Sequence, residues 1–280
     1  MPRSVLAIQV AYLVCVSLLF ILRVGTPNIL FFALVVPLGL IWSVRSRGFV
    51  LAFSPFLALI FFYEQLRSIA VRLTLASIHV TDLIAWERSL FGGVLPTYWL
   101  QQRLGSGALS KVLWTASIVV YGTHFVSPVL LALLIWARRR DFYWRYIGGL
   151  LTITYLGFLG YVIFPAAPPW WAYHFGYLTE PIRSHLSATV LLQTPNPVAA
   201  MPSLHASWAL YVALVVWRLW GRWLGLAAMS LPLAMCFATV YLGHHYVIDQ
   251  FAGWALTILL FVPLTLVWSR FESRRARSTV

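Results

Sequence analysis

Long apolar runs, separated by short connections rich in arginine, constrain the fold of this chain more than any other feature. Several of these runs approach the ~20 residues that an α-helix needs to cross ~30 Å of hydrocarbon. A soluble domain of 280 residues could not cover so much apolar surface, because 61% of the residues are hydrophobic and only 10% are charged. The sequence therefore predicts an all-α fold, a polytopic bundle of membrane helices that forms one integral membrane domain.

Eight membrane crossings are predicted from the apolar runs. They cover residues 5–23, 28–44, 49–66, 110–137, 144–164, 205–219, 223–241 and 248–269. The first run is long for a signal peptide and no small-residue cleavage site follows it, so we expect it to be retained. We divide the chain into N-terminal helices (1–66), an interfacial outer segment (67–109), a catalytic core (110–270) and a basic tail (271–280).

The distribution of positive charge predicts the orientation of the chain in the membrane. The net charge is +13, but the basic residues lie between apolar runs, which is typical of a topology signal and not of a nucleic-acid-binding surface. Most of the arginines lie in short connections at alternate helix ends and in the C-terminal tail. The positive-inside rule then places both termini in the cytoplasm, and residues 68–109, 165–204 and 243–247 outside the plasma membrane.

Two segments on the predicted outer side have distinct compositions. Residues 82–104 mix aromatic and apolar side chains with charges and a Gly92-Gly93 break, which is typical of interfacial amphipathic helices. Residues 165–202 are rich in proline and aromatic residues, which favours a lid or a substrate-facing loop. The only cysteines, Cys15 and Cys236, lie inside apolar runs, so neither a structural disulfide nor a cysteine metal site is expected.

A histidine and an aspartate at a spacing of four form the first candidate catalytic pair. His245 and Asp249 would lie on one face of a helix, within hydrogen-bonding reach. A carboxylate in that place holds one imidazole nitrogen as N–H and leaves the other free to attack phosphorus. The pair lies where the last crossing begins, so we also expect the positive end of that helix dipole to favour an incoming phosphate.

A second motif, Pro202-Ser203-Leu204-His205, stands at the start of the crossing at 205–219. Pro202 or Ser203 is expected to cap this helix and to present backbone N–H groups and a hydroxyl to an anion. His205 is then placed to protonate a leaving oxygen, a role that typically contributes roughly 10²–10⁴-fold to a rate. One helix can cross the membrane and another return between the two motifs, which brings both histidines to the same face.

Other interpretations of these residues stay open. A histidine in a helical run is more often a packed or interfacial residue than a catalytic one, although ionisable groups at the edge of membrane helices are rare and usually functional. His244, His245 and Asp249 are also of metal-ligand types. Adjacent histidines point in different directions on a helix, however, and no HExxH-like spacing is present, so the sequence predicts no metal and no cofactor.

In these two motifs the chain resembles the type 2 phosphatidic acid phosphatase (PAP2) superfamily. Residues 202–205 and the His245-x-x-x-Asp249 spacing match its second and third motifs. Leu204 in place of the common Gly, the doubled His244-His245 and the sequence of residues 164–171 are similar to the inositol phosphorylceramide synthase branch and its bacterial relatives. Similarity to the same relatives extends to residues 82–101 and 121–125.

The resemblance implies a six-helix core, with His245 as a nucleophile that Asp249 orients and His205 as the acid for the leaving group. It also implies a phosphohistidine intermediate that water or an acceptor alcohol resolves, without a metal. The usual Lys-x6-Arg-Pro motif is absent, and Thr239 stands where an arginine usually precedes the nucleophile. The phosphate charge still needs partners in a site of low dielectric.

Several residues of the predicted outer side are candidates for binding the phosphate or the headgroup. These are Ser203, Arg67, Arg72, Arg183, His244 and His124. An interfacial arginine that pairs with lipid phosphates is an equally good interpretation of each arginine. A buried histidine that bonds to a neighbouring helix is an equally good interpretation of His124.

The sequence thus predicts a membrane lipid phosphotransferase that moves a phosphate-bearing headgroup through phospho-His245 at the outer face. Hydrolysis of a lipid phosphate or diphosphate by the same residues is the alternative. A non-enzymatic lipid-binding or transport protein is a third hypothesis, but it would not need an oriented nucleophile. The expected partner is a membrane phospholipid, or an isoprenoid or sphingolipid phosphate, as substrate; neither nucleic acid nor an obligate protein partner is expected.

Overall fold

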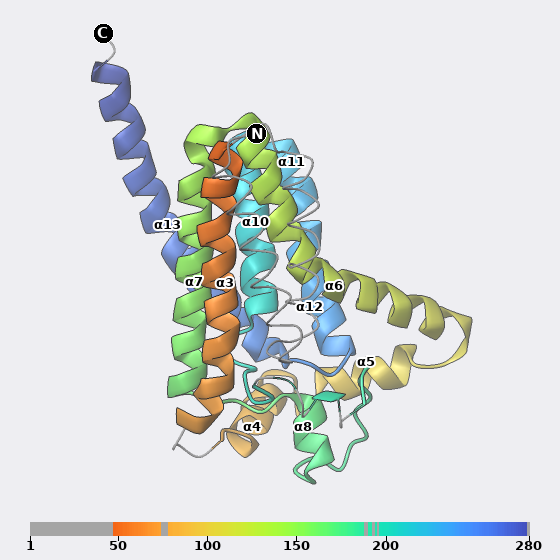
Figure 1. Cartoon of the computed structure of the whole chain (residues 1–280). Coiled ribbons are helices and arrows are strands. Elements are labelled where there is room, and N and C mark those ends of the chain that lie inside the picture. Colours follow the sequence, from red (N-terminus) through yellow and green to blue (C-terminus); the bar gives the residue numbers. More distant parts are fainter. Residues whose placement is uncertain (1–46, 74–77, 188–189, 192–193, 195, 279–280) are drawn as a thin grey trace. The chain divides into compact units, whose positions relative to one another are not determined.

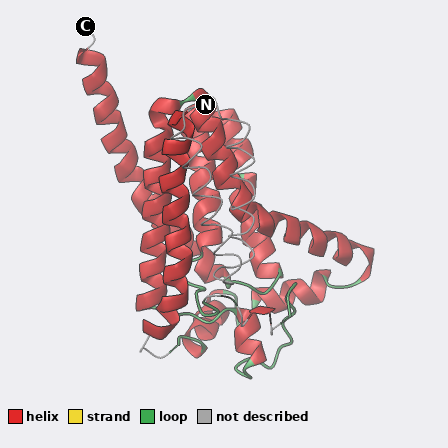
Figure 2. Ribbon diagram, viewed as in Figure 1, coloured by secondary structure: helices red, strands yellow, loops and turns green. Residues whose placement is uncertain are grey.

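The computed structural model describes residues 47–73, 78–187, 190–191, 194 and 196–278. The chain divides into two compact units, Met1–Ile69 and Ala70–Val280, and each is described by itself. Within the described ranges the regular elements are helices (Figure 2). Two isolated parallel bridges accompany them. The predicted all-α fold is confirmed, while the crossings predicted at 5–23 and 28–44 lie outside the described residues.

The described part of the first unit belongs to helix α3 (Arg47–Leu73), which contains the crossing predicted at 49–66. Near its C-terminal end, the Arg67 guanidinium donates to the Glu64 carboxylate at 3.0 Å, one helical turn away. The same guanidinium lies 5.9 Å from the centre of the Tyr63 ring. Arg67 is therefore held by side chains of its own helix.

The second unit is a bundle of long helices with short helices and loops gathered at one end (Figure 1). The helices that lie near this end are α4 (Thr81–Leu90), α5 (Pro96–Leu104) and α8 (Pro169–His174). The bundle consists of α6 (Gly107–Arg138), η1 (Arg140–Phe142), α7 (Tyr143–Ile163), α10 (Leu204–Trp220), α11 (Arg222–Ala228), α12 (Ser230–Tyr241) and α13 (Val247–Ser278).

Among the described residues, four helical stretches are long and apolar enough to cross a membrane. They are Gly107–Arg138, Arg140–Ile163, Arg222–Tyr241 and Val247–Trp268. Helix α10 is apolar but has only 17 residues, which at 1.5 Å per residue gives about 26 Å. The last helix extends from Val247 to Ser278, beyond the predicted end at 269, because its arginine-rich continuation stays helical.

Helix α10 is the centre of the bundle, and packs against α6, α7, α12 and α13. Its contact with α13 is close because a glycine faces it: a Cβ built on Gly253 would lie 2.3 Å from the Ser203 carbonyl oxygen. Ser207 Oγ donates to the Gly253 carbonyl at 2.9 Å, and Thr257 Oγ1 donates to the Ser207 carbonyl at 3.1 Å. Small residues and interhelical hydrogen bonds of this kind allow membrane helices to approach closely. The contact sets the start of α13 beside the start of α10.

The segment predicted as a lid is fixed to the rest of this end by backbone hydrogen bonds. Ala166 N–H donates to the Val198 carbonyl at 2.9 Å, and Ala200 N–H donates to the Ala166 carbonyl at 3.1 Å. Trp170 N–H donates to the Gly243 carbonyl at 3.0 Å, which links α8 to the turn between α12 and α13. The loop therefore forms part of the wall around that turn.

Helices α4 and α5 have the amphipathic character predicted for residues 82–104. Leu83 and Ile84 are buried in a cluster with the loop, whereas Trp86, Leu90 and Trp99 are exposed. Bulky apolar groups on the outer surface of short helices favour a position at the boundary between headgroups and acyl chains.

Basic residues gather at the opposite end of the second unit. Arg139 and Arg140 lie between α6 and α7, and Arg218 lies at the end of α10. The Arg218 guanidinium lies 5.8 Å from the Trp268 ring, and Phe142 also packs on Trp268. The two connections and the C-terminal part of α13 are therefore at one end of the bundle, away from α4, α5 and α8.

Candidate active site

A tight turn between α12 and α13 places the first predicted catalytic histidine. Gly243 has φ +77°, which a residue with a Cβ rarely adopts. The backbone N–H groups of His244 and His245 both donate to the Thr239 carbonyl, at 2.9 and 3.3 Å. Gln250 Nε2 donates to Thr239 Oγ1 at 2.9 Å. Thr239, which replaces the arginine expected at this position, thus fixes the backbone of both histidines.

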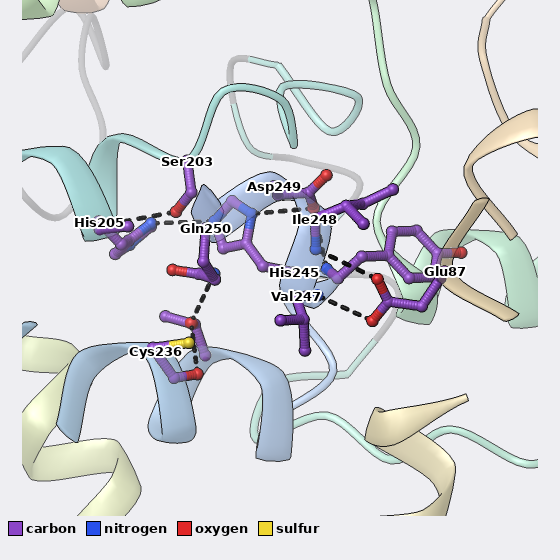
Figure 3. Close-up of polar contacts among 12 residues, drawn as sticks. Glu87, Ser203, His205, Cys236, His245, Val247, Ile248, Asp249 and Gln250 are labelled. Atoms are coloured by element: carbon purple, nitrogen blue, oxygen red, sulfur yellow. Dashed lines mark hydrogen bonds and ion pairs between the residues drawn. The ribbon is translucent and has the colours of Figure 1, made fainter. Parts of the chain in front are cut away.

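His205, His245 and Asp249 form one continuous line of hydrogen bonds (Figure 3). His245 Nδ1 lies 3.4 Å from Asp249 Oδ2, and His245 Nε2 lies 3.2 Å from His205 Nδ1. Tyr246 N–H also donates to Asp249 Oδ2 at 2.9 Å. Because a carboxylate accepts, we assign the His245 proton to Nδ1, which leaves Nε2 as the acceptor of a proton on His205 Nδ1.

The first turns of α10 and α13 are joined by a backbone hydrogen bond. The Ser203 N–H donates to the Asp249 carbonyl at 3.0 Å, and Ser203 Oγ accepts from the Ala206 N–H at 3.3 Å. Ser203 is therefore the N-cap of α10, as its position in the motif predicts. Its side chain is fully buried, so its hydroxyl oxygen serves the helix end.

Glu87 of α4 occupies the N-terminus of α13. Its carboxylate accepts the N–H groups of Val247 at 2.8 Å and of Ile248 at 3.1 Å (Figure 3). These two residues lie between His245 and Asp249 in the chain. We expected this helix end to attract the substrate phosphate, but the carboxylate of Glu87 takes the place of an anion there.

The protonation of Glu87 reflects two opposing effects. Burial raises the pKa of its carboxyl to about 7, while the two backbone hydrogen bonds act in the opposite direction and the nearby Asp249 adds to the rise. The side chain has no exposed surface. A buried carboxyl with a pKa of about 7 is therefore bonded to the segment that joins His245 to Asp249.

The ring of His205 lies among aromatic rings from α6 and α10. Its centre is 4.7 Å from that of Tyr121 and 4.2 Å from that of His124. His124 in turn stacks on Trp208 at 4.4 Å. His124 and Trp208 lie one helical turn from Tyr121 and His205 on their respective helices, so the rings of α6 and α10 interleave. This packing fixes the plane of the His205 imidazole.

The other predicted ligands of the phosphate lie at different distances from the line of hydrogen bonds. His244 is next to His245, but its Nε2 is within hydrogen-bond distance of Ser184 Oγ at 3.1 Å and His185 Nδ1 at 2.9 Å. The Arg183 guanidinium lies over the Trp114 ring at 5.3 Å. Arg67 belongs to the first unit, and the side chain of Arg72 lies outside the described residues. Their roles as phosphate ligands stay predictions.

Two sets of residues at this site belong to no recognisable motif, so the sequence contains no signal for their positions. Glu87 is one acid in an amphipathic helix, and only its contact across more than a hundred residues shows its partner. Ser184 and His185 lie in a loop whose position depends on Gln101: its amide donates to the Arg183 carbonyl at 2.9 Å and to the Tyr241 carbonyl at 2.8 Å. Among the described side chains no group of three or more His, Cys, Asp or Glu residues could hold a metal ion.

Comparison with known proteins connects this geometry to a family. Residues 81–263 match the sequence model of the PAP2 superfamily. The phosphoinositol dihydroceramide synthase of Bacteroides thetaiotaomicron is 28% identical over 249 residues, which cover 78% of this chain and 77% of that protein. The inositol phosphorylceramide synthase catalytic subunit of Schizosaccharomyces pombe is 27% identical over 216 residues, 63% of this chain and 47% of that protein.

This chain thus spans about half of the Schizosaccharomyces pombe subunit. No solved structure matches the chain. The family match covers α4 to the middle of α13, and so includes Glu87, both histidine motifs and the helices that carry them. The chain belongs to the PAP2 superfamily and is an integral membrane enzyme that acts on lipid phosphate esters.

Proposed function

We propose that this enzyme is a lipid phosphotransferase that transfers a phosphate-bearing headgroup from a phospholipid to the hydroxyl of an acceptor lipid. The observation that carries the proposal is the line Asp249–His245–His205, in which the Nε2 of His245 faces His205 at 3.2 Å. A nucleophile beside a proton donor, with its tautomer held by a carboxylate, is the arrangement that covalent catalysis requires.

The first half of the reaction forms a phosphohistidine. The phosphate enters between the two imidazoles, and the lone pair of His245 Nε2 forms a bond to phosphorus. The bond between phosphorus and the oxygen of the leaving diacylglycerol breaks, and that oxygen takes the Nδ1 proton of His205, which enters the step as an imidazolium and leaves it as the neutral ring. Asp249 stabilises the positive charge that develops on the His245 ring.

The second half returns the enzyme to its starting state. His205, now without that proton, accepts the hydroxyl proton of the acceptor while the acceptor oxygen bonds to phosphorus. The bond between phosphorus and His245 Nε2 breaks, and its electrons return to the imidazole. An acceptor lipid gives transfer and water gives hydrolysis, so the two activities differ only in this step.

The relatives favour transfer over hydrolysis, because both have names that denote synthases of phosphoinositol-bearing sphingolipids. A sphingolipid with a free hydroxyl is therefore the acceptor that we propose. Hydrolysis of a lipid phosphate by the same residues is the second candidate, since nothing in the chemistry of the line of hydrogen bonds prevents water from taking the acceptor's place.

We also propose that the site faces the outer side of the plasma membrane. The site lies at the end of the bundle formed by α4, α5 and α8, and Arg139, Arg140 and Arg218 lie at the opposite end. The positive-inside rule places the basic end in the cytoplasm. In a cysteine-free background, an impermeant maleimide should label Thr179→Cys in intact cells and Arg139→Cys only after lysis. The reverse labelling would contradict this orientation.

The reaction is tested with the purified chain in vesicles that contain a radiolabelled phospholipid donor and ceramide. Labelled phosphosphingolipid without water-soluble label indicates transfer. Labelled headgroup phosphate, or free phosphate from a donor without a headgroup, indicates hydrolysis. His245→Gln should abolish both products, whereas the matched control His174→Gln, an exposed histidine of α8, should keep them. Full activity in His245→Gln would refute the proposed nucleophile.

The covalent intermediate has a direct test. Acid-labile, alkali-stable label on the protein after a rapid quench with headgroup-labelled donor would identify phosphohistidine, and Asp249→Asn should reduce its formation. Activity should persist in EDTA; reproducible loss with rescue by Zn²⁺ or Mn²⁺ would instead favour a metal site.

A further inference from the structure

A second polar cluster lies beside the line of hydrogen bonds and has no role in the mechanism above. Ser184, His185 and His244 form it, with both partners within hydrogen-bond distance of His244 Nε2, at 3.1 and 2.9 Å. We call these residues the Ser184 cluster. His244 is buried, while Ser184 and His185 are half-buried, so part of the cluster is accessible.

One aromatic ring connects the Ser184 cluster to the catalytic groups. The centre of the Tyr121 ring is 5.1 Å from that of His185 and 5.1 Å from that of His244, and it is 4.7 Å from that of His205. His244 also precedes the nucleophile directly in the chain. The cluster is therefore next to the nucleophile in the chain, and it shares the Tyr121 ring with His205.

The loops that carry the cluster are fixed before any substrate binds. Gln101 bonds to Arg183 N–H through its Oε1 at 2.9 Å and to the Arg183 and Tyr241 carbonyls through its Nε2. The Gly243 turn is so close to the same loop that an added Cβ would lie 2.8 Å from the Arg183 carbonyl oxygen. Binding groups that are already in place cost a ligand little ordering.

The chemistry of the cluster suits an uncharged ligand. Burial, together with His185 and His245 close by, holds the pKa of His244 well below its usual value, and burial lowers the pKa of His185. Neutral imidazoles and a serine hydroxyl both donate and accept hydrogen bonds, as the hydroxyls of a polyol do. A phosphate anion would instead require charged donors.

We infer that the Ser184 cluster is the subsite for a hydroxyl-rich, uncharged headgroup that is carried on the phosphate during transfer. The inference rests on the proposed function and names the substrate class of the same site. It also separates the roles of the doubled histidines: His245 bonds to phosphorus, and His244 with its partners selects what the phosphate carries.

The test compares two donors that share the same diacylglycerol but differ in headgroup. Dioleoyl phosphatidylinositol carries a polyol, and dioleoyl phosphatidic acid carries none. The variants are Ser184→Ala and His185→Phe, the latter of which keeps a ring against Tyr121. His174→Phe serves as the control on α8. The readout is kcat/KM for each donor, measured as diacylglycerol release from mixed micelles that also contain ceramide as the acceptor.

The wild-type chain should prefer the polyol donor, and each variant should lose about 2- to 10-fold of that preference, which is the value of one neutral hydrogen bond. The loss should appear in KM, with phosphatidic acid turnover unchanged. His185→Gln, which restores a donor and an acceptor, should recover part of the preference.

Other outcomes overturn the inference in distinguishable ways. Equal losses with both donors, or no loss in either variant, would mean that the cluster only shapes the loop. A wild-type chain that prefers phosphatidic acid would refute the polyol subsite and leave the phosphohistidine chemistry standing. Diacylglycerol release from neither donor would refute the proposed function together with this inference.

Discussion

The carboxyl group of Glu87 gives the most specific prediction of this structure, because Glu87→Gln replaces a single carboxyl oxygen with an amide nitrogen. Glu87 accepts two backbone hydrogen bonds at the start of α13, and burial raises the pKa of its carboxyl from 4.5 to about 7. The charged form is thus disfavoured by about 3 kcal/mol in the folded state, at 1.36 kcal/mol per pKa unit.

The sign of the pH effect follows from proton uptake. Between pH 4.5 and about 7 the folded protein keeps a proton on Glu87 that the unfolded chain has lost. The free energy of unfolding therefore falls as the pH rises through this window, and this loss is complete above the window. Glu87→Gln carries no titrating proton, so its stability relative to the wild-type chain should increase by up to about 3 kcal/mol from pH 4.5 to pH 8.

The activity of Glu87→Gln should be lower than that of the wild-type chain, although its relative stability rises with pH. The ionised carboxylate accepts with both oxygens, whereas glutamine has only one acceptor, so either Val247 or Ile248 loses its partner. A hydrogen bond to a charged group is worth about 1.5–3 kcal/mol, which limits the loss in kcat/KM to roughly 10- to 100-fold. The wild-type enzyme at pH 5 should approach the activity of Glu87→Gln, because its carboxyl is then protonated.

Thermal unfolding in detergent at several pH values, with lipid turnover measured in parallel, tests both effects. Asp141→Asn, an exposed acid at the far end of the bundle, is the matched control and should follow the wild-type curves. Parallel stability–pH curves for the wild-type chain and Glu87→Gln would refute the reasoning, as would full activity of Glu87→Gln at pH 8.

Three further substitutions test how the helices carry the site. Gly253→Ala should destabilise the fold severely and separate α10 from α13, because the new Cβ would lie 2.3 Å from a backbone oxygen; Gly148→Ala, with open space around it, should be neutral or stabilising in the same melting assay. Gly243→Ala places strain of about 1–3 kcal/mol on the turn before His245. Its turnover should therefore fall by more than the loss of folded protein in the melting assay accounts for. Thr239→Val should cost about 1–3 kcal/mol in unfolding free energy, because it leaves the buried Gln250 amide without its acceptor, and an unchanged melting temperature would contradict the assigned bond.

The sequence indicated the fold class and the proximity of His245 to Asp249 because both depend on local spacing. Apolar runs of membrane length can form only a few structures, and four of the predicted crossings correspond to described helices long enough to span a bilayer. His245 and Asp249 do meet, at 3.4 Å, but not on one helix face as the spacing predicted, because His245 lies in the turn before α13 begins at Val247. The N-cap role of Ser203 likewise follows from its position directly before an apolar helix.

The expectation for the dipole of α13 did not include Glu87, for a reason that no local pattern contains. The start of the helix is positive in any structure, but which anion meets it depends on what packs there. Glu87 arrives from a helix 160 residues earlier in the chain. A single acid in an amphipathic segment gives no sequence signal for such a partner.

Taken by itself, the sequence determined that this protein is a helical membrane protein of the PAP2 superfamily and named the residues of its line of hydrogen bonds. Only the tertiary structure decided that His205 meets His245 directly, since that contact depends on Gly253 allowing α10 and α13 to approach. It also decided that Glu87 occupies the helix end and that Ser184 and His185 join His244. The physical reason is that hydrogen bonds between distant segments depend on packing in three dimensions, which residue spacing along one helix does not encode.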